Sequence, residues 1–291
     1  MKTHLKPVIE KAPDGIREFI AGFTKEDLFR APIVVVPVFQ NHWLLEGLIN
    51  SLRLIGLTKF LLLDGSMRQL AFHSIDEDLH IHHAYVGANP GPRYFAQNKA
   101  VYETLPKWFI VTDPDIRLGP QFPSDGISTF IKVSTELKVG KVATALRIPQ
   151  YEKPEEYFFG GRWQTIEKWE AQFWREKIEN SLELEVFRAN TDTTFALYNK
   201  QYFCPASFFE AVRVAGDFTS LHLPWEPDWK SIEGSRNLHS TWDNSLSIER
   251  LRRAVELQQD RIDRLHASMS WKLTAPLRQV RRFFLRAIGR R

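Results

Sequence analysis

Two aspartates, Asp113 and Asp115, follow a run of apolar residues and are the strongest candidates for chemistry in this chain. The run, residues 108–111, predicts a buried strand of a parallel sheet, and Pro114 stiffens the turn between the two acids. Carboxylates at the carboxyl end of such a strand lie where open α/β sheets bind their ligands. Two hard oxygen donors there can hold one divalent cation, which neutralises a diphosphate. The alternative is that both aspartates only cap the loop after the strand.

Three further polar residues stand where strands are expected to end or helices to begin. Asp64 follows the apolar run 59–63, where a carboxylate is well placed to meet a ribose hydroxyl. Arg93 stands at an expected helix start, where a cation is unfavourable unless it faces an anion such as a diphosphate. A plain surface arginine is the alternative reading. His222 lies in a loop rich in Gly, Pro and aromatic residues, and it could complete the coordination of a cation held by two aspartates.

Apolar periodicity places these side chains on an α/β framework. Buried strands are expected at residues 33–39, 59–63, 79–86 and 142–148, and helices at 44–55, 94–104, 126–137 and 163–177. Asp14 and Thr24 are expected to start helices in the lead-in, Asn41 to cap helix 44–55, and Asp192 to open a strand. His80 and His82 share one face of the third strand with no further ligand nearby, so packed or solvated histidines are expected. Together the elements predict an α/β fold with a mostly parallel sheet flanked by helices.

Composition limits the classes of protein that the chain can represent. With 291 residues, 43% of them hydrophobic and 13% aromatic, the sequence can build one large α/β domain, or a domain plus an appendage. A single cysteine, Cys204, excludes an internal disulfide and fits a reducing cytosol. No apolar leader or membrane-spanning stretch is expected. No Gly-x-Gly-x-x-Gly follows the first strand, which argues against a classical dinucleotide fold, and no P-loop appears.

The order of these motifs resembles bacterial GT-A-fold glycosyltransferases of polysaccharide and O-antigen assembly. The resemblance covers residues 33–225 and rests on Asp113-Pro114-Asp115, the block 192–198 and the block 222–225, with looser matches at Asp64 and in the loop 89–93. It implies a GT-A-like, Rossmann-like catalytic domain that binds a nucleotide-diphosphate sugar. By the same resemblance Asp113 and Asp115 would hold Mn²⁺ or Mg²⁺ on the donor diphosphate, with His222 as a metal or phosphate ligand. Asp64 and Asn89 would contact the nucleoside.

Transfer of a sugar to a hydroxyl also requires a base and a stabilised leaving group. Arg93 and a cation would stabilise the charge that develops on the diphosphate. Asp192 is the first candidate for the base and Glu170 the second. The sequence lacks the Glu-Asp pair typical of the large inverting family, so inversion or retention of the anomeric centre stays open.

Two other functions fit parts of the pattern. A sugar nucleotidyltransferase also places acids and a cation on an α/β sheet, but its Gly-rich loop after the first strand is absent here. A non-catalytic scaffold of a polysaccharide-assembly complex would keep the fold and use the C-terminal tail to dock other enzymes. The intact Asp113, Asp115 and His222 favour an enzyme over a scaffold.

The C-terminal tail differs from the body in charge and in periodicity. Residues 246–291 carry 12 Lys and Arg against 4 Asp and Glu, whereas the remainder carries 27 basic and 31 acidic residues. Residues 248–269 follow the a/d spacing of a coiled coil and predict a homo-oligomer. Residues 277–291 predict a basic amphipathic helix at the inner-membrane surface. We therefore expect a catalytic domain, residues 1–245, and a helical extension, residues 246–291, in a cytoplasmic protein bound peripherally to the membrane, with no nucleic-acid partner.

Overall fold

The computed structural model describes residues 3–5, 12–39, 41–66, 70–72, 78–87, 91–150, 156–159 and 162–226. The expected domain boundary at residues 245 and 246, the coiled coil 248–269 and the basic helix 277–291 lie outside these residues. Asn89 lies outside them as well. Nothing in the structure therefore tests the oligomerisation or the membrane association predicted from the tail.

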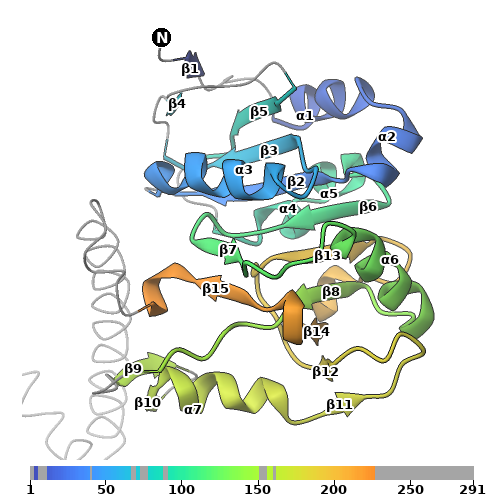
Figure 1. Ribbon diagram of the computed structural model, residues 1–291. Coiled ribbons are helices and arrows are strands. Elements are labelled where there is room, and N and C mark those ends of the chain that lie inside the picture. Colours follow the sequence, from blue (N-terminus) through green and yellow to red (C-terminus); the bar gives the residue numbers. More distant parts are fainter. Residues whose placement is uncertain are drawn as a thin grey trace, which may run out of the picture. The chain divides into compact units, whose positions relative to one another are not determined.

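A nine-stranded mixed sheet forms the framework of the described chain (Figure 1). Its strands, in spatial order, are β11 (Lys177–Ile178), β12 (Val186–Arg188), β14 (Val212–Val214), β8 (Lys141–Thr144), β13 (Ala196–Asn199), β6 (Trp108–Val111), β2 (Ile33–Val38), β3 (Lys59–Asp64) and β5 (His80–Tyr85). The run β6-β2-β3-β5 is parallel throughout. β13 pairs antiparallel with both β6 and β8, so the other half of the sheet is mixed.

Helices cover both faces of this sheet. α3 (Leu45–Arg53), preceded by η1 (His42–Leu44), and α6 (Gly126–Leu137) pack on one face, and α1 (Ala12–Ala21), α4 (Tyr94–Gln97) and α5 (Lys99–Thr104) pack on the other. Successive side chains of a strand point to opposite faces, so Val34 and Val36 join the first core while Ile33 and Val35 join the second. Burial on both faces is the reason that these strands are continuous apolar runs. The α/β class predicted from the sequence is confirmed.

The remaining elements are short. Three two-stranded ribbons pair β1 (Thr3–Leu5) with β4 (Leu70–Phe72), β9 (Glu156–Phe159) with β10 (Arg162–Thr165), and β7 (Ile116–Leu118) with β15 (Ser220–His222). The other helical segments are α2 (Lys25–Arg30), α7 (Ile166–Glu170), η2 (Ala171–Trp174), η3 (Pro205–Ser207), η4 (Gly216–Phe218) and η5 (Leu223–Trp225). No helix of the described residues has the length and apolar character needed to cross a membrane.

Several local predictions are confirmed and others are wrong. Helix 126–137 has the predicted bounds, and Thr24 caps α2 in a reciprocal capping box with Asp27. Asn41 does not cap the following helix, because its side-chain oxygen accepts the backbone N–H of Phe39 instead. His80 and His82 are packed as expected, against Phe23 and Phe19 respectively.

The expected helix 163–177 is shorter than its apolar spacing suggested. Residues 162–165 form strand β10, and Thr165 then caps α7 by accepting the N–H of Lys168. The expected helix 94–104 is interrupted at Asn98, which ends α4 and caps α5. The strand expected to open at Asp192 begins at Ala196, so Asp192 lies in the loop before β13. Local caps overrode helical periodicity in the first two cases.

Candidate functional site

The Asp113-Pro114-Asp115 segment lies between β6 and β7, at the carboxyl end of the parallel strands. The backbone N–H of Asp113 donates to the carbonyl of Thr193 at 3.1 Å, and the Thr193 hydroxyl donates to Asp113 Oδ2 at 2.7 Å. The loop before β13 therefore fixes the first aspartate. Pairing of β15 with β7 places His222 opposite Ile116, so its Nε2 lies 3.5 Å from Asp115 Oδ2. Two short strands thus bring His222 to the second aspartate, as the sequence predicted.

Burial and mutual charge shift the ionisation of all three groups. Burial and the neighbouring Asp115 carboxylate together raise the pKa of Asp113 to about 7, against the opposing effect of the hydrogen bond from Thr193. Burial also opposes ionisation of Asp115, but His222 outweighs it and lowers the pKa of that aspartate. In turn Asp115 raises the pKa of the His222 imidazole against the effect of its burial. These shifts favour an ionised Asp115 beside a protonated His222, and they leave Asp113 only partly ionised near pH 7.

Asp113, Asp115 and His222 have the ligand types of a divalent-cation site, but their side chains are not yet arranged around one point. Asp115 Oδ1 and His222 Nδ1 are buried and have no hydrogen-bond partner, and two carboxylates with an imidazole suit Mn²⁺ or Mg²⁺. A nearby cation would also remove the repulsion that raises the pKa of Asp113. Among the described residues, however, no three His, Cys, Asp or Glu side chains already converge as metal ligands. Cation binding would therefore require Asp113 or His222 to turn.

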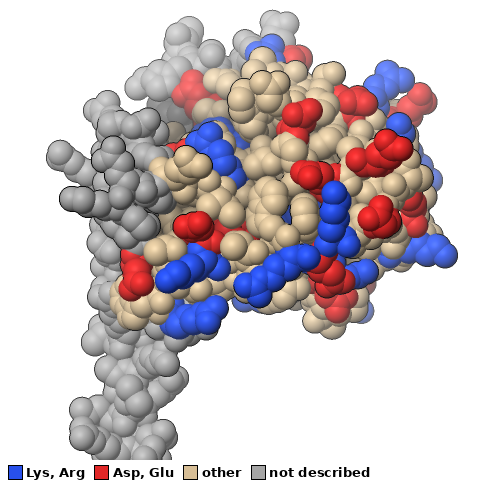
Figure 2. Space-filling view, turned by 60° about the horizontal axis from the view of Figure 1, so that its bottom comes forward, with Lys and Arg blue, Asp and Glu red and all other residues tan. Residues whose placement is uncertain are grey.

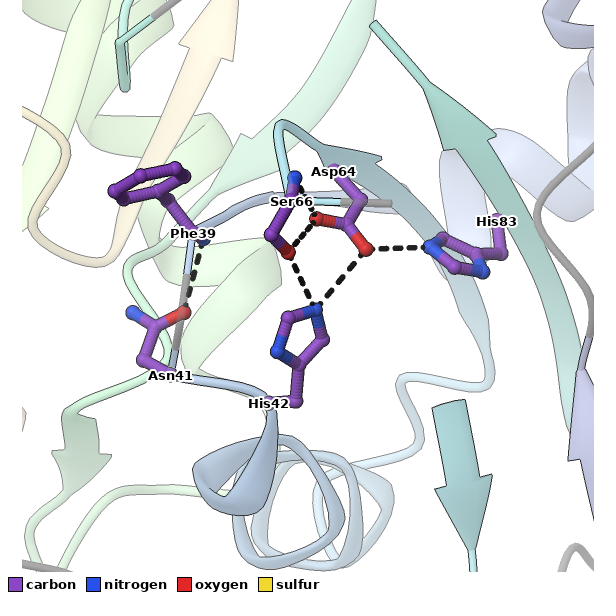
Figure 3. Close-up of polar contacts among 6 residues, drawn as sticks. All are labelled: Phe39, Asn41, His42, Asp64, Ser66 and His83. Atoms are coloured by element: carbon purple, nitrogen blue, oxygen red, sulfur yellow. Dashed lines mark hydrogen bonds and ion pairs between the residues drawn. The ribbon is translucent and has the colours of Figure 1, made fainter. Parts of the chain in front are cut away.

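Asp64 lies at the end of β3, as predicted, but protein donors surround it (Figure 3). Its Oδ2 lies 3.0 Å from His42 Nε2 and 2.8 Å from His83 Nε2, and its Oδ1 accepts the backbone N–H and the hydroxyl of Ser66 at 2.7 and 2.5 Å. Burial opposes its ionisation, yet these bonds outweigh burial and hold the pKa of Asp64 below its usual range. The carboxylate is fully buried. A direct bond to a nucleoside would have to displace one of these partners.

The loop that precedes α4 reaches the same edge of the sheet. Gly91 and Pro92 line a cavity of about 120 Å³ together with Asp113 and with Phe39, which follows β2. Arg93 packs on aromatic rings. Its guanidinium carbon lies 5.7 Å from the ring centre of Phe208 and 5.1 Å from that of Phe209. It is partly buried. The diphosphate contact predicted for Arg93 stays a prediction.

Asp192 lies in the loop before β13, next to Thr193, whose hydroxyl donates to Asp113. Two basic residues, Arg93 and Lys141, lie near its carboxylate. The residue is exposed, but surrounding protein atoms remove part of the water around its carboxylate, and this desolvation raises the pKa of Asp192. The charges of Arg93 and Lys141 oppose the rise. The fully buried Lys141 donates to the carbonyls of Thr191, Asp192 and Phe208 at 2.8, 3.3 and 2.6 Å. Burial lowers the pKa of this lysine to about 7, against the attraction of Asp192. An accessible carboxylate with a raised pKa on a fixed backbone has the properties of a general base.

Glu170, the second candidate for the base, is held in a buried ion pair. Its Oε2 accepts from Arg213 at 2.9 Å, and 1% of the residue is exposed. Arg213 also donates to the Thr191 hydroxyl at 3.0 Å and to the carbonyl of Asn190 at 2.8 Å, and its guanidinium lies 4.0 Å from the ring of Phe173. Burial raises the pKa of Glu170, and Arg213 opposes the rise. The pair therefore supports the loop that carries Asp192.

Replacing Arg213 by methionine is expected to lower the free energy of unfolding by about 3–5 kcal/mol, because Glu170 would remain as a buried charge without its partner. Urea denaturation of the purified variant measures this cost. Arg188→Met is the matched control: Arg188 pairs with Glu176 at the same kind of distance, 2.8 Å, but on the surface. Its loss is expected to change stability by less than about 1 kcal/mol. Equal effects of the two variants would contradict a buried pair.

No family model matches this chain, and no curated protein matches it.

Four residues of this region were not predicted as functional from the sequence: His42, His83, Lys141 and Arg213. Two of them carried a signal. Lys141 opens an apolar strand, and Arg213 stands alone among apolar residues in β14. A single charge inside an apolar strand indicates a buried, paired group. The two histidines carried no such signal, because their partner Asp64 comes from a different strand.

Proposed function

We propose that this protein is a metal-dependent glycosyltransferase of GT-A type that moves a sugar from a nucleotide-diphosphate sugar to a saccharide acceptor. The observation that carries the proposal is the pair of aspartates, Asp113 and Asp115, just after the carboxyl end of β6, with His222 beside Asp115 and a buried Asp115 Oδ1 that has no hydrogen-bond partner. The parallel run β6-β2-β3-β5 supports a Rossmann-like nucleotide-binding half. Asp113, Asp115 and His222 would hold the cation, which when bound supplies positive charge to a leaving diphosphate.

The remaining site residues would position the substrates and move a proton. Asp192 would accept the proton of the acceptor hydroxyl, and Lys141 fixes the backbone of the loop on which it lies. Arg93 would stand near the diphosphate, and the Asp64 network would shape the floor of the nucleoside site. Figure 2 shows acidic and basic side chains interspersed over the described part of one face.

A thermal-shift screen of nucleoside diphosphates, each with and without Mn²⁺, tests this proposal. We expect one nucleotide to raise the melting temperature only when Mn²⁺ is present. A ligand at a hundred times its dissociation constant adds about 2.7 kcal/mol to the free energy of unfolding. If no nucleoside diphosphate stabilises the protein with Mn²⁺, the proposed function is wrong.

The tail would serve assembly and placement in this function. We propose that residues 248–269 join copies of the chain and that residues 277–291 bind the inner-membrane surface, where a lipid-linked acceptor would lie. Truncation after Ser270 is expected to abolish binding to anionic liposomes and to leave the oligomeric state unchanged, since each lost arginine contributes about 1 kcal/mol at such a surface. Liposome flotation and light scattering measure the two properties. Unchanged flotation of the truncated chain would contradict this division.

A further inference from the structure

A second cavity, of about 730 Å³, lies away from the two aspartates. Its walls come from the end of α6, from η2 and the residues after it, from the end of β12, from the turn after β13 and from the segment before β14. Asp113 lines a different and smaller cavity. A volume of this size lies within the range of about 300–1,000 Å³ typical of small-molecule sites. No role in the proposed reaction has so far been assigned to it.

The lining combines planar polar side chains with aromatic rings. Phe173 and Tyr202 are half-buried in the wall, whereas Glu176, Glu210 and Asn190 are exposed. Arg188, also in the lining, donates from Nε to Glu176 Oε1 at 2.8 Å. Carboxylate, amide and guanidinium groups can bond to neighbouring hydroxyls, and aromatic rings stack on the apolar faces of sugars.

The charges in the wall select against other classes of ligand. Two acids, Glu176 and Glu210, and two bases, Lys138 and Arg188, line the cavity, so its side-chain charges balance, and the negative end of the α6 dipole adds no attraction for an anion. A wholly apolar ligand would strip water from these charged groups without replacing their hydrogen bonds. A neutral molecule rich in hydroxyl groups satisfies all of these conditions.

The cavity is joined to the proposed site through one loop. Asn190 forms part of the wall, and its carbonyl accepts from Arg213 at 2.8 Å. Two residues later comes Asp192, whose carbonyl accepts from Lys141, and then Thr193, whose hydroxyl donates to Asp113. A molecule in the cavity would therefore contact the same segment that carries the candidate base and fixes the candidate metal ligand.

We infer that this cavity is a second saccharide-binding site, which holds a neutral oligosaccharide portion of the acceptor at a distance from the transferred sugar. That the bound saccharide is part of the acceptor rests on the proposed function, whereas the cavity and the chemistry of its lining do not. Binding of the acceptor there adds affinity without using the groups that take part in the transfer. It also places the acceptor against the loop at residues 189–193, which carries Asp192.

Saturation-transfer NMR with four neutral trisaccharides, built from glucose, galactose, mannose or N-acetylglucosamine, tests the inference on the full chain. We expect at least one to bind. Asn190→Trp should fill the cavity while keeping the backbone carbonyl that Arg213 uses, and Glu176→Gln should remove a charged acceptor from the wall. Each variant is expected to weaken binding at least tenfold. Glu185→Gln is the matched control: Glu185 is an exposed acid just before β12, paired with Lys177 and outside the lining. It should change binding less than twofold.

The outcomes separate this inference from the proposed function. Failure of all four trisaccharides to bind the wild-type protein, or binding that neither cavity variant weakens, overturns the second site. Trisaccharide binding that Asn190→Trp or Glu176→Gln abolishes supports it. The nucleoside diphosphates with Mn²⁺ are measured on the same samples. A protein that binds trisaccharides in the cavity but no nucleotide keeps the second site and loses the proposed transferase activity.

Discussion

Asp113→Asn is expected to abolish Mn²⁺-dependent binding of a nucleoside diphosphate and, at the same time, to make the metal-free protein more stable at pH 8. The first effect follows because the amide removes a negatively charged ligand from the proposed cation site. The second follows from the raised pKa of Asp113, about 7 against an ordinary value of 3.8. Above pH 7 the folded protein must hold this carboxylate ionised in a buried place beside Asp115, and the asparagine removes that cost.

The pH dependence of the stability difference has a definite sign. A raised pKa in the folded state means that the folded protein binds more protons than the unfolded chain between pH 3.8 and about 7. Stability of the metal-free wild type therefore falls as pH rises through this window. We expect Asp113→Asn to be about 1–3 kcal/mol more stable than wild type at pH 8 and nearly equal to it at pH 4.

Urea denaturation at pH 4 and pH 8, with a chelator or with Mn²⁺ and nucleotide, measures both effects. With Mn²⁺ and nucleotide present, the wild type should be more stable than Asp113→Asn at pH 8, because only the wild type is stabilised by binding them. Asp217→Asn is a suitable control, since Asp217 is an exposed acid in η4. A variant that keeps Mn²⁺-dependent nucleotide affinity would remove Asp113 from the cation site. A variant that is less stable than wild type at pH 8 would show that its charge is compensated in the folded protein.

The parallel half of the sheet could be predicted from the sequence because its strands are buried on both faces. Such strands are continuous apolar runs, and the residue that ends each run is then placed at the ligand-binding edge. Asp64 and Asp113 were found in this way, and both stand at or just after a strand end. The strands of the mixed half could not be predicted in this way, because β12 and β14 have only three residues each and three residues do not establish an apolar periodicity.

The partners of the site residues could be predicted less well than their positions. The contact of His222 with Asp115 depends on the pairing of two three-residue strands far apart in the chain. The bonds from His42 and His83 to Asp64 likewise join η1, β5 and β3, and no local pattern encodes such a meeting. Glu170, the second candidate for the base, lies at the end of α7, and only its burial against Arg213 identifies a supporting role.

Asp192→Asn is expected to reduce turnover by about 10²–10⁴-fold, the usual scale for loss of a general base. Mn²⁺-dependent nucleotide binding should stay nearly unchanged. The substitution preserves the shape of the side chain and the carbonyl that Lys141 holds, so the loop should keep its place. Glu170→Gln, by contrast, is expected to cost stability and to retain most of the turnover, because that carboxylate faces Arg213.

The pH profile of turnover separates a base from a merely structural acid. A carboxylate that accepts a proton from the acceptor must be ionised, so activity of the wild type should fall on the acid side as Asp192, with its raised pKa, becomes protonated. At saturating Mn²⁺, where the cation keeps Asp113 ionised, this acidic fall should disappear from the residual activity of Asp192→Asn and should remain in Glu170→Gln. If the asparagine variant kept near-normal turnover, or lost activity with an unchanged acidic fall, another group would have to take the proton. Asp192 is the first residue to test because its position is fixed. Lys141 donates to its carbonyl, and the next residue, Thr193, donates to Asp113.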